Sequence, residues 1–455
     1  MKLRKICLYV VAMIFSVNVT YSQKDSSLSL SDESELQWFK DAKFGMFIHW
    51  GLYSILEGSY NGHTLPDESF TYGKSWYAEW IQKRFEISDA EYQALAQKFN
   101  PVNFNADEWI REAKNAGMRY FAITSKHHDG FALWDSEYSD FDIMSTPYGK
   151  DILAELVAAC RKYDIKYGFY YSHWLDWEYP GGALPDWPTV TQPSDKEFQK
   201  YWAGKCLPQV KELINKFDPD FLWFDTWGTE EIHITTARRD ELIRLVRENS
   251  SKCLINGRIS FANPGENIDF LEMMDNEYPE GILQKPWQTP ATMQHTWGWH
   301  ANDFNWKSST RMLQYLVNNT SKGGNYLLNI GPKADGSFPV PSIRRLREMG
   351  AWLYANGESV YGASHVDVDL GSDENIYLTQ KIDGDQEYIY VSIVNPVEEV
   401  AIPLDLTTRI RKAHILETSQ QVTFSAGKEQ TVLFIPKEAR RDTSIQVVKI
   451  ELDGK

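Results

Sequence analysis

The sequence predicts an α/β protein: a (β/α)8-type barrel followed by a C-terminal antiparallel β-sandwich domain. Strand-like and helix-like segments alternate from Trp38 to about Tyr361, which gives about eight βα units over roughly 300 residues, as in such a barrel. Polar side chains follow successive strand-like runs, where barrels place their functional groups. After about Gly362, alternating apolar residues with Asp-Gly and Asn-Pro turns replace this pattern. We therefore expect a barrel over 23–361 and a β domain over 362–455.

The individual elements follow from apolar periodicity. Short apolar runs predict barrel strands at 43–51, 120–125, 166–171, 221–224, 253–258, 267–274, 291–299 and 325–330. Helical spacing predicts helices at 107–116, 151–163, 198–217, 240–249 and 311–317. Alternation predicts strands of the β domain at 375–381, 387–394 and 430–435.

The N-terminus is typical of a signal peptide over 1–22. Lys2, Arg4 and Lys5 precede a mostly apolar run, and Thr20-Tyr21-Ser22 resembles a cleavage site. The apolar run is shorter than the ~20 residues that cross a bilayer. These features predict an exported protein without membrane insertion, periplasmic or secreted, and lipidation at Cys7 is the weaker alternative.

The composition excludes several classes of function. A net charge of −16 at pH 7 argues against nucleic acid and anionic membranes, whose binders cluster Lys and Arg. Cys160, Cys206 and Cys253 are well separated, so they form no disulfide framework and have no zinc spacing. The chain contains 17 Trp and 24 Tyr, and such side chains can form the apolar platforms on which sugar rings stack.

Asp225 is the leading candidate for a catalytic group. It directly follows Phe221-Leu222-Trp223-Phe224, an uninterrupted apolar run of the kind that is buried on both faces in a parallel sheet. Its carboxylate would therefore lie at the carboxyl end of a strand, where barrels place their chemistry. An Asp that caps the next helix or opens a turn is the competing interpretation.

Other strand-like runs also end in polar or aromatic groups. These are His49, His127, His128, Tyr171 and Arg258. A single His is more often a hydrogen-bonded core residue, but several at the ends of different strands would converge on one mouth of a barrel. The sequence therefore predicts one polar site at that mouth.

Four long motifs resemble glycoside hydrolase family 29, the α-L-fucosidases. They are Trp38 to Ser54 (WFKDAKFGMFIHWGLYS), Thr124 to Phe131 (TSKHHDGF), Leu222 to Asp225 (LWFD), and Gly323 to Pro332 (GGNYLLNIGP). The resemblance covers the whole predicted barrel, and the β domain fits the C-terminal sandwich of that family. It implies a retaining exo-glycosidase that needs no metal or other cofactor and acts on terminal α-L-fucosyl residues of fucosylated glycans.

The resemblance also implies roles for particular residues. Asp225 matches the nucleophile, which forms a covalent glycosyl-enzyme in retaining enzymes. His49, Trp80, His127, His128, Tyr171 and Arg258 match positions that hold the sugar. Imidazoles and a guanidinium group can fix hydroxyl groups, and an aromatic wall suits the C6 methyl group of a deoxy sugar.

One position departs from the family pattern. The family's acid/base is often a Glu in a Pro-Trp-Glu context, and the matching segment here ends in Gln288. An amide cannot donate a proton as a general acid, so Gln288 is predicted only to bind substrate. Glu79, which matches a second glutamate used in some relatives, and Glu277 are the candidate acids, with Glu79 slightly favoured. A shifted alignment across this loop is a further explanation.

Two alternatives remain open from the sequence. A retaining glycosidase for a related sugar, such as a galactoside, would need room for a C6 hydroxyl group. A catalytically weakened carbohydrate-binding protein would explain Gln288. The sequence leaves linkage preference, aglycone and oligomeric state undetermined.

Overall fold

The computed structural model describes residues 33–368, 375–406, 409–440 and 445–453. The predicted signal peptide lies outside the described residues. Within them, no helix combines the length and the apolar character that crossing a membrane requires.

The first part of the chain is built on eight parallel strands. These are β1 (Phe44–Ile48), β4 (Tyr120–Lys126), β5 (Lys166–Tyr171), β6 (Phe221–Phe224), β7 (Leu254–Ile255), β8 (Leu271–Glu272), β9 (Trp287–Thr292) and β10 (Asn325–Ile330). Their order in the sheet is β7-β6-β5-β4-β1-β10-β9-β8. The end of β7 and the segment just after it join the segment just before β8 through two hydrogen bonds, from Asp269 N to Ile255 O (2.9 Å) and from Gly257 N to Phe270 O (2.8 Å). The sheet therefore curls into a barrel.

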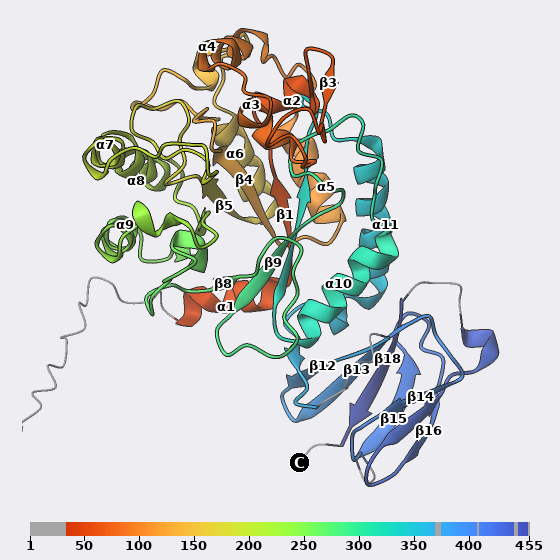
Figure 1. The fold of residues 1–455 in the computed structure, drawn as a ribbon. Helices are drawn as coiled ribbons and strands as arrows, with labels where there is room; N and C mark the ends of the chain where they lie inside the picture. The colour runs from red at the N-terminus through yellow and green to blue at the C-terminus, as the bar shows by residue number, and fades with distance from the viewer. Residues whose placement is uncertain (1–32, 369–374, 407–408, 441–444, 454–455) are drawn as a thin grey trace, which may run out of the picture.

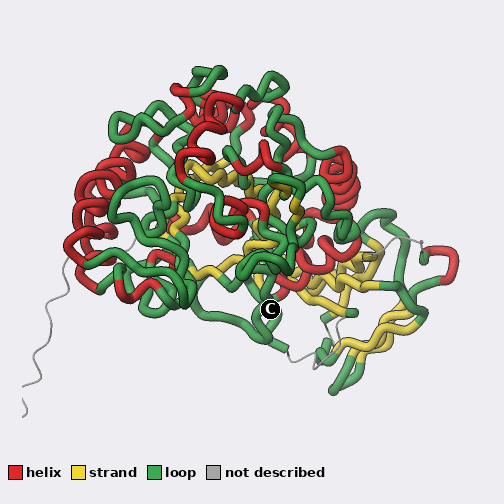
Figure 2. The backbone as a smooth tube through the Cα atoms, turned by 45° about the horizontal axis from the view of Figure 1, so that its top comes forward, coloured by secondary structure: helices red, strands yellow, loops and turns green. Residues whose placement is uncertain are grey.

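Helices surround this barrel (Figures 1 and 2). They are α1 (Glu33–Ala42), α5 (Ala106–Asn115), α6 (Ile152–Tyr163), α7 (Asp195–Tyr201), α8 (Leu207–Phe217), α9 (Thr236–Asn249), α10 (Ser309–Ser321) and α11 (Val340–Asn356). Their starts follow local sequence signals: Asp151 caps α6, and Ser194 with Glu197 forms a capping box at α7. A π-helical turn at Trp202–Cys206 joins α7 to α8, so the helix predicted over 198–217 is interrupted.

Short elements between β1 and α5 form one side of the barrel mouth. They are α2 (Tyr53–Leu56), β2 (Ser59–Tyr60), β3 (His63–Thr64), a 3-10 turn at Ala78–Trp80, α3 (Ile81–Arg84), α4 (Asp89–Gln93) and a 3-10 helix at Ala94–Lys98. They gather above the strands (Figure 1). Together with the other long loops at this end, they supply much of the wall of the cavity described below.

The barrel interior is apolar and aromatic. Phe47, Tyr120, Tyr170, Trp223 and Leu327 all belong to one buried cluster inside the ring of strands. Successive strand residues face opposite sides, so their neighbours in sequence pack outward against the helices. Strands that are covered on both faces consist of consecutive apolar residues, which is why the sequence pattern identified them.

The second part of the chain consists of antiparallel sheets. Its strands are β11 (Ser364–His365), β12 (Ile376–Asp383), β13 (Gln386–Val394), β14 (Glu399–Ile402), β15 (Ile410–Ile415), β16 (Thr423–Ala426), β17 (Thr431–Phe434) and β18 (Ile445–Leu452). They form a sheet of order β11-β12-β13-β18-β15 and a sheet of order β14-β17-β16, with an apolar core of their own. Figure 1 shows this part beside α10. The predicted fold class is confirmed.

One barrel strand lies earlier than predicted. The sequence placed it at 291–299, whereas β9 runs from Trp287 to Thr292. The residues after Thr292 instead form a loop at the mouth. The apolar pattern misled here because Trp297 and its neighbours are buried without being in a strand. This shift decides where Gln288 lies.

Candidate active site

A cavity of about 410 Å³ opens at the carboxyl ends of the barrel strands. Of the residues singled out in the sequence, the structure brings eight together around it: His49, Glu79, Trp80, His127, His128, Asp225, Arg258 and Glu277. They come from segments separated by up to hundreds of residues, and they meet because parallel strands all end at the same mouth.

Asp225 lies in the inner part of this cavity, directly after β6. Its Oδ2 accepts a hydrogen bond from the hydroxyl group of Tyr170 (2.7 Å), and its Oδ1 lies 3.1 Å from Arg258 Nη2. His128 Nε2 is 3.8 Å from Oδ2. Burial raises the pKa of Asp225 to about 6, although Arg258 opposes this shift. The carboxylate is therefore fixed in position and ionised at neutral pH.

Arg258 connects two carboxylates in the cavity. It lies in a 3-10 turn just after β7, and its Nε donates to the backbone oxygen of Thr226 (3.0 Å). Its Nη1 lies 2.8 Å from Asp275 Oδ1, while Nη2 faces Asp225. A guanidinium group presents donors in a fixed planar arrangement, so these contacts orient both carboxylates.

Three imidazoles form another part of the wall, and all are neutral. His49 Nδ1 lies 2.7 Å from Asn329 Oδ1, and His128 Nδ1 lies 2.7 Å from Ser172 Oγ. Burial lowers the pKa of His49 to about 3 and places the pKa values of His127 and His128 well below the usual range. A neutral imidazole can donate at one nitrogen and accept at the other, which suits hydroxyl groups.

Glu79 is a buried carboxyl group in the wall. The 3-10 turn Ala78–Trp80 presents it, and the residue is only 1% exposed. Its Oε2 accepts hydrogen bonds from Gly298 N (2.9 Å) and Thr296 Oγ1 (3.2 Å). Its Oε1 has no partner among the described residues. Burial raises the pKa of Glu79 to about 7.

Glu277 has the opposite environment. It follows β8 in the loop that also contains Asp275, and it is exposed to solvent while lining the same cavity. The two candidate acids thus differ in place, with Glu79 buried in the wall and Glu277 at the open rim.

Aromatic rings complete the wall. Trp80 meets His128 edge-on at a centroid distance of 4.9 Å, and Trp297 lies 4.9 Å from His49. Trp223 packs under the guanidinium group of Arg258 at 5.1 Å. Such a wall offers apolar area beside fixed polar groups, as binding sites for small molecules commonly do.

The structure does not bring Tyr171 to the cavity. Its hydroxyl group donates to Gln209 Oε1 (2.9 Å) on α8, outside the barrel. The preceding residue, Tyr170, points inward and contacts Asp225. Adjacent strand residues face opposite sides, so an assignment shifted by one residue selects the wrong face. Tyr170 takes the place that the sequence analysis gave to Tyr171.

Gln288 also lies away from the cavity. It is the second residue of β9 and fully buried; its amide donates to Glu272 Oε1, and its oxygen accepts from Tyr120 OH (2.7 Å). Tyr120 is the first residue of β4, so this contact belongs to the amino-terminal end of the barrel. The role predicted for Gln288, binding substrate at the mouth, does not fit this position. The strand expected at 291–299 would have left Gln288 in the loop before it, whereas β9 includes this residue.

Sequence reasoning missed Tyr170 and Asp275. Asp275 follows a strand of only two residues, β8, which the apolar pattern did not delimit well. The strand-end rule that selected Asp225 would have selected Asp275 had that strand been located. Among the described residues, no group of three or more His, Cys, Asp or Glu side chains could hold a metal ion.

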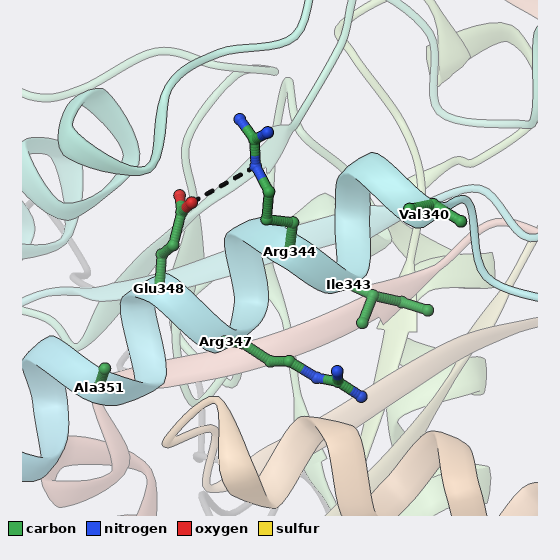
Figure 3. Close-up of a pocket in the computed structure, with 6 residues that line it drawn as sticks. All are labelled: Val340, Ile343, Arg344, Arg347, Glu348 and Ala351. Carbon is green, nitrogen blue, oxygen red and sulfur yellow. Dashed lines mark ion pairs between the residues drawn. The ribbon is translucent and has the colours of Figure 1, made fainter.

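A larger hollow, of about 650 Å³, lies on the outer face of α11 (Figure 3). It is bordered by Val340, Ile343, Arg347 and an ion pair between Arg344 and Glu348 (3.4 Å). All these residues come from one helix, and its charged side chains pair with carboxylates, Arg344 with Glu348 and Arg347 with Glu112. The cavity at the barrel mouth is therefore the candidate active site.

Comparisons with known proteins agree with this geometry. A family model described as Alpha-L-fucosidase matches residues 12–358. Plasma alpha-L-fucosidase of Rattus norvegicus is 31% identical over 342 residues, which cover 71% of this chain and 70% of the relative. Alpha-L-fucosidase isoenzyme 1 from Paenibacillus thiaminolyticus matches with a TM-score of 0.77 and 30% identity, covering 92% of this chain and 99% of that chain.

A GH29 alpha-L-fucosidase from Bacteroides thetaiotaomicron, trapped as a covalent intermediate with 2-fluoro-fucosyl fluoride, matches with a TM-score of 0.81 and 25% identity. The match covers 94% of this chain and 98% of that chain, and the trapped enzyme is a glutamate-to-glutamine mutant.

Proposed function

The chain belongs to the alpha-L-fucosidase family, and we propose that its barrel cavity hydrolyses terminal α-L-fucosyl groups with Asp225 as the nucleophile. The enzyme is a retaining glycoside hydrolase, in keeping with the covalent intermediate trapped in the matching structure. The observation that supports the role of Asp225 best is its fixation by Tyr170 and Arg258 in the inner part of the cavity, with a pKa of about 6.

The reaction then proceeds in two steps. A carboxylate oxygen of Asp225 attacks the anomeric carbon while the bond to the leaving oxygen breaks and that oxygen takes a proton from a carboxylic acid. In the second step, the same acid, now ionised, removes a proton from water, and the water oxygen displaces Asp225. Two inversions at the anomeric carbon leave its configuration unchanged.

Glu277 is the proton donor in this proposal. The leaving oxygen connects the fucosyl group to a glycan that extends into solvent, so its partner acid has to reach the open side of the cavity. Glu277 is exposed there, whereas Glu79 is buried and both hydrogen bonds to its Oε2 come from protein groups. The raised pKa of Glu79 is the observation that favours the other assignment, because a general acid works best near its operating pH.

The other polar groups hold the sugar. The neutral His49, His127 and His128 offer donors and acceptors for hydroxyl groups. The ring of Trp80 offers apolar area for the methyl group of the deoxy sugar. The interpretation as a weakened binding protein depended on Gln288 in the position of the acid, and Gln288 is buried outside the cavity.

The substrates in this proposal are fucosylated glycans outside the cytoplasm. The predicted signal peptide supports export, and the similar enzymes of Rattus norvegicus and Homo sapiens are plasma alpha-L-fucosidases. The alternative sugar, a galactoside, is not favoured, because the matching family model and the relatives compared are described as alpha-L-fucosidases.

One set of variants tests the roles. Asp225→Asn should lower kcat by at least about 10³-fold, or about 4 kcal/mol of barrier. Asp275→Asn is the matched control, because the Asp275 carboxylate also pairs with Arg258. This variant should lower kcat much less than Asp225→Asn. Glu277→Ala should slow oligosaccharides far more than aryl fucosides, which need little protonation, and azide should partly restore turnover of the aryl substrate.

The opposite pattern would reassign the acid. If Glu79→Ala shows azide rescue and selective loss on oligosaccharides, while Glu277→Ala does not, Glu79 is the proton donor. Activity of Asp225→Asn within about tenfold of the parent, on the order of 1.4 kcal/mol, would exclude Asp225 as the nucleophile.

A further inference from the structure

The rim of the cavity contains an aromatic platform that the reaction at Asp225 does not use. Trp187 lies in the long loop between β5 and α7 and lines the outer cavity together with Asp186. One face of its ring stacks on Tyr72, with centroids 3.9 Å apart and planes inclined by only 15°. The ring is only partly buried, so it presents apolar area at the mouth.

Several contacts from the surrounding chain hold this platform in place. Tyr72 OH lies 2.9 Å from Thr189 Oγ1, which ties the loop that contains Trp187 to the segment that contains Tyr72. Arg84 Nη1 donates to the backbone oxygen of Tyr72 (2.7 Å), and its guanidinium carbon lies 5.9 Å from the centre of the Trp187 ring. A ring that is already fixed loses little conformational freedom when a ligand stacks on it.

A carboxylate stands directly beside the platform. Asp186 is exposed, and its Oδ2 accepts a hydrogen bond from Trp227 Nε1 (3.2 Å). A carboxylate can accept further hydrogen bonds, and sugar hydroxyl groups donate them. An aromatic face and an adjacent acceptor together match a pyranose ring, which has an apolar face and hydroxyl groups around its edge.

The platform also lies in the right direction from the reacting centre. Trp80 packs against His128 at 4.9 Å on its inner side, and Trp187 lies 6.1 Å from Trp80, next along the wall. Since His128 is beside Asp225, the rings lead from the nucleophile to the rim. A fucosyl group bound at Asp225 would place the sugar to which it is linked near Trp187.

We propose that Trp187 and Asp186 form a subsite for the uncharged pyranose that carries the fucosyl group. The ring stacks on Trp187, and its hydroxyl groups donate to Asp186. This inference rests on the proposed function, and it gives the enzyme a preference for fucosylated oligosaccharides over substrates whose leaving group has no ring.

Two substrates separate this subsite from the reaction itself. Trp187→Ala should lower kcat/KM for a fucosylated disaccharide about tenfold more than for α-L-fucosyl fluoride, whose leaving group cannot stack. Trp187→Phe should keep most of the preference for the disaccharide over the fluoride. Asp186→Asn should reduce this preference less than Trp187→Ala does. Trp299→Ala is the matched control, because this partly exposed Trp donates to Glu57 and does not line the cavity. Its kcat/KM should be unchanged for both substrates.

Three outcomes would overturn the proposal. Equal losses on both substrates would mean that Trp187 supports the reacting centre, and no loss on either would mean that the leaving sugar does not contact it. A parent enzyme that hydrolyses neither substrate would overturn the proposed function as well, so the two failures are distinguishable.

Discussion

Glu79 shows how burial changes the chemistry of a side chain, even where hydrogen bonds oppose the change. A carboxyl group that is ordinary in sequence acquires a pKa of about 7, against a usual value of 4.5, because it is removed from water. Folding therefore favours its protonated form. The free energy of unfolding therefore decreases as the pH rises from about 4.5 to about 7. Above that range the decrease has reached its full size.

We expect Glu79→Gln to stabilise the protein at pH 8 and to have little effect at pH 4, where Glu79 is protonated in both the folded and unfolded states. The gain at pH 8 should be at most about 3 kcal/mol. The other buried carboxyl groups are the same in both proteins, so the difference isolates Glu79. Urea unfolding at the two pH values measures it, and an equal difference at both would contradict the assigned cause.

At the scale of an element, β5 places two adjacent tyrosines in different surroundings, one beside Asp225 and one beside α8. Tyr170 faces the barrel interior and donates to Asp225, whereas Tyr171 faces α8 and donates to Gln209. Both residues are tyrosines, so their order in the strand decides which one reaches the cavity.

The two tyrosines therefore form a matched pair of variants. In the proposed mechanism Asp225 attacks as a carboxylate, so activity should fall as the pH falls through its pKa of about 6. Tyr170→Phe removes a hydrogen bond that lowers this pKa, so the acidic limb of kcat/KM should move to higher pH and the maximum should fall about tenfold or more. Tyr171→Phe should leave the pH profile unchanged and cost about 1 kcal/mol of stability. A shifted profile in Tyr171→Phe would contradict this assignment.

At the scale of the whole molecule, the β domain shares its interior with the barrel. Tyr377, Val394 and Ile445 belong to the same buried apolar cluster as the barrel helices. Trp352 on α11 donates to the backbone oxygen of Ile445 (2.9 Å), which ties the last strand to the barrel. The two parts therefore stabilise one another.

Removing residues 362–455 should destabilise the barrel by several kcal/mol, because burying one large apolar side chain contributes roughly 1.5–3 kcal/mol. Thermal unfolding of the truncated chain should give a clearly lower Tm than the parent. The KM of any folded fraction should stay the same, since every residue that lines the cavity precedes Ser364. An unchanged Tm would mean that the shared interior contributes nothing.

The sequence by itself determined the barrel, the β domain and the nucleophile candidate. Strands buried on both faces need continuous apolar residues, and their carboxyl ends converge, so Asp225, His49, His127 and Arg258 could be assigned to one mouth. These features depend on local pattern and on a general property of parallel sheets, so they could be predicted without the structure.

Only the tertiary structure decided which side of its strand each residue faces and how deeply each carboxyl group is buried. Whether Tyr170 or Tyr171 enters the cavity depends on strand orientation, and the position of Gln288 depends on where β9 begins. Glu79 is buried because Gly298 and Thr296, more than two hundred residues away in sequence, close over it, while Glu277 stays at the open rim. Burial and pKa are set by such distant contacts, which a local pattern does not contain.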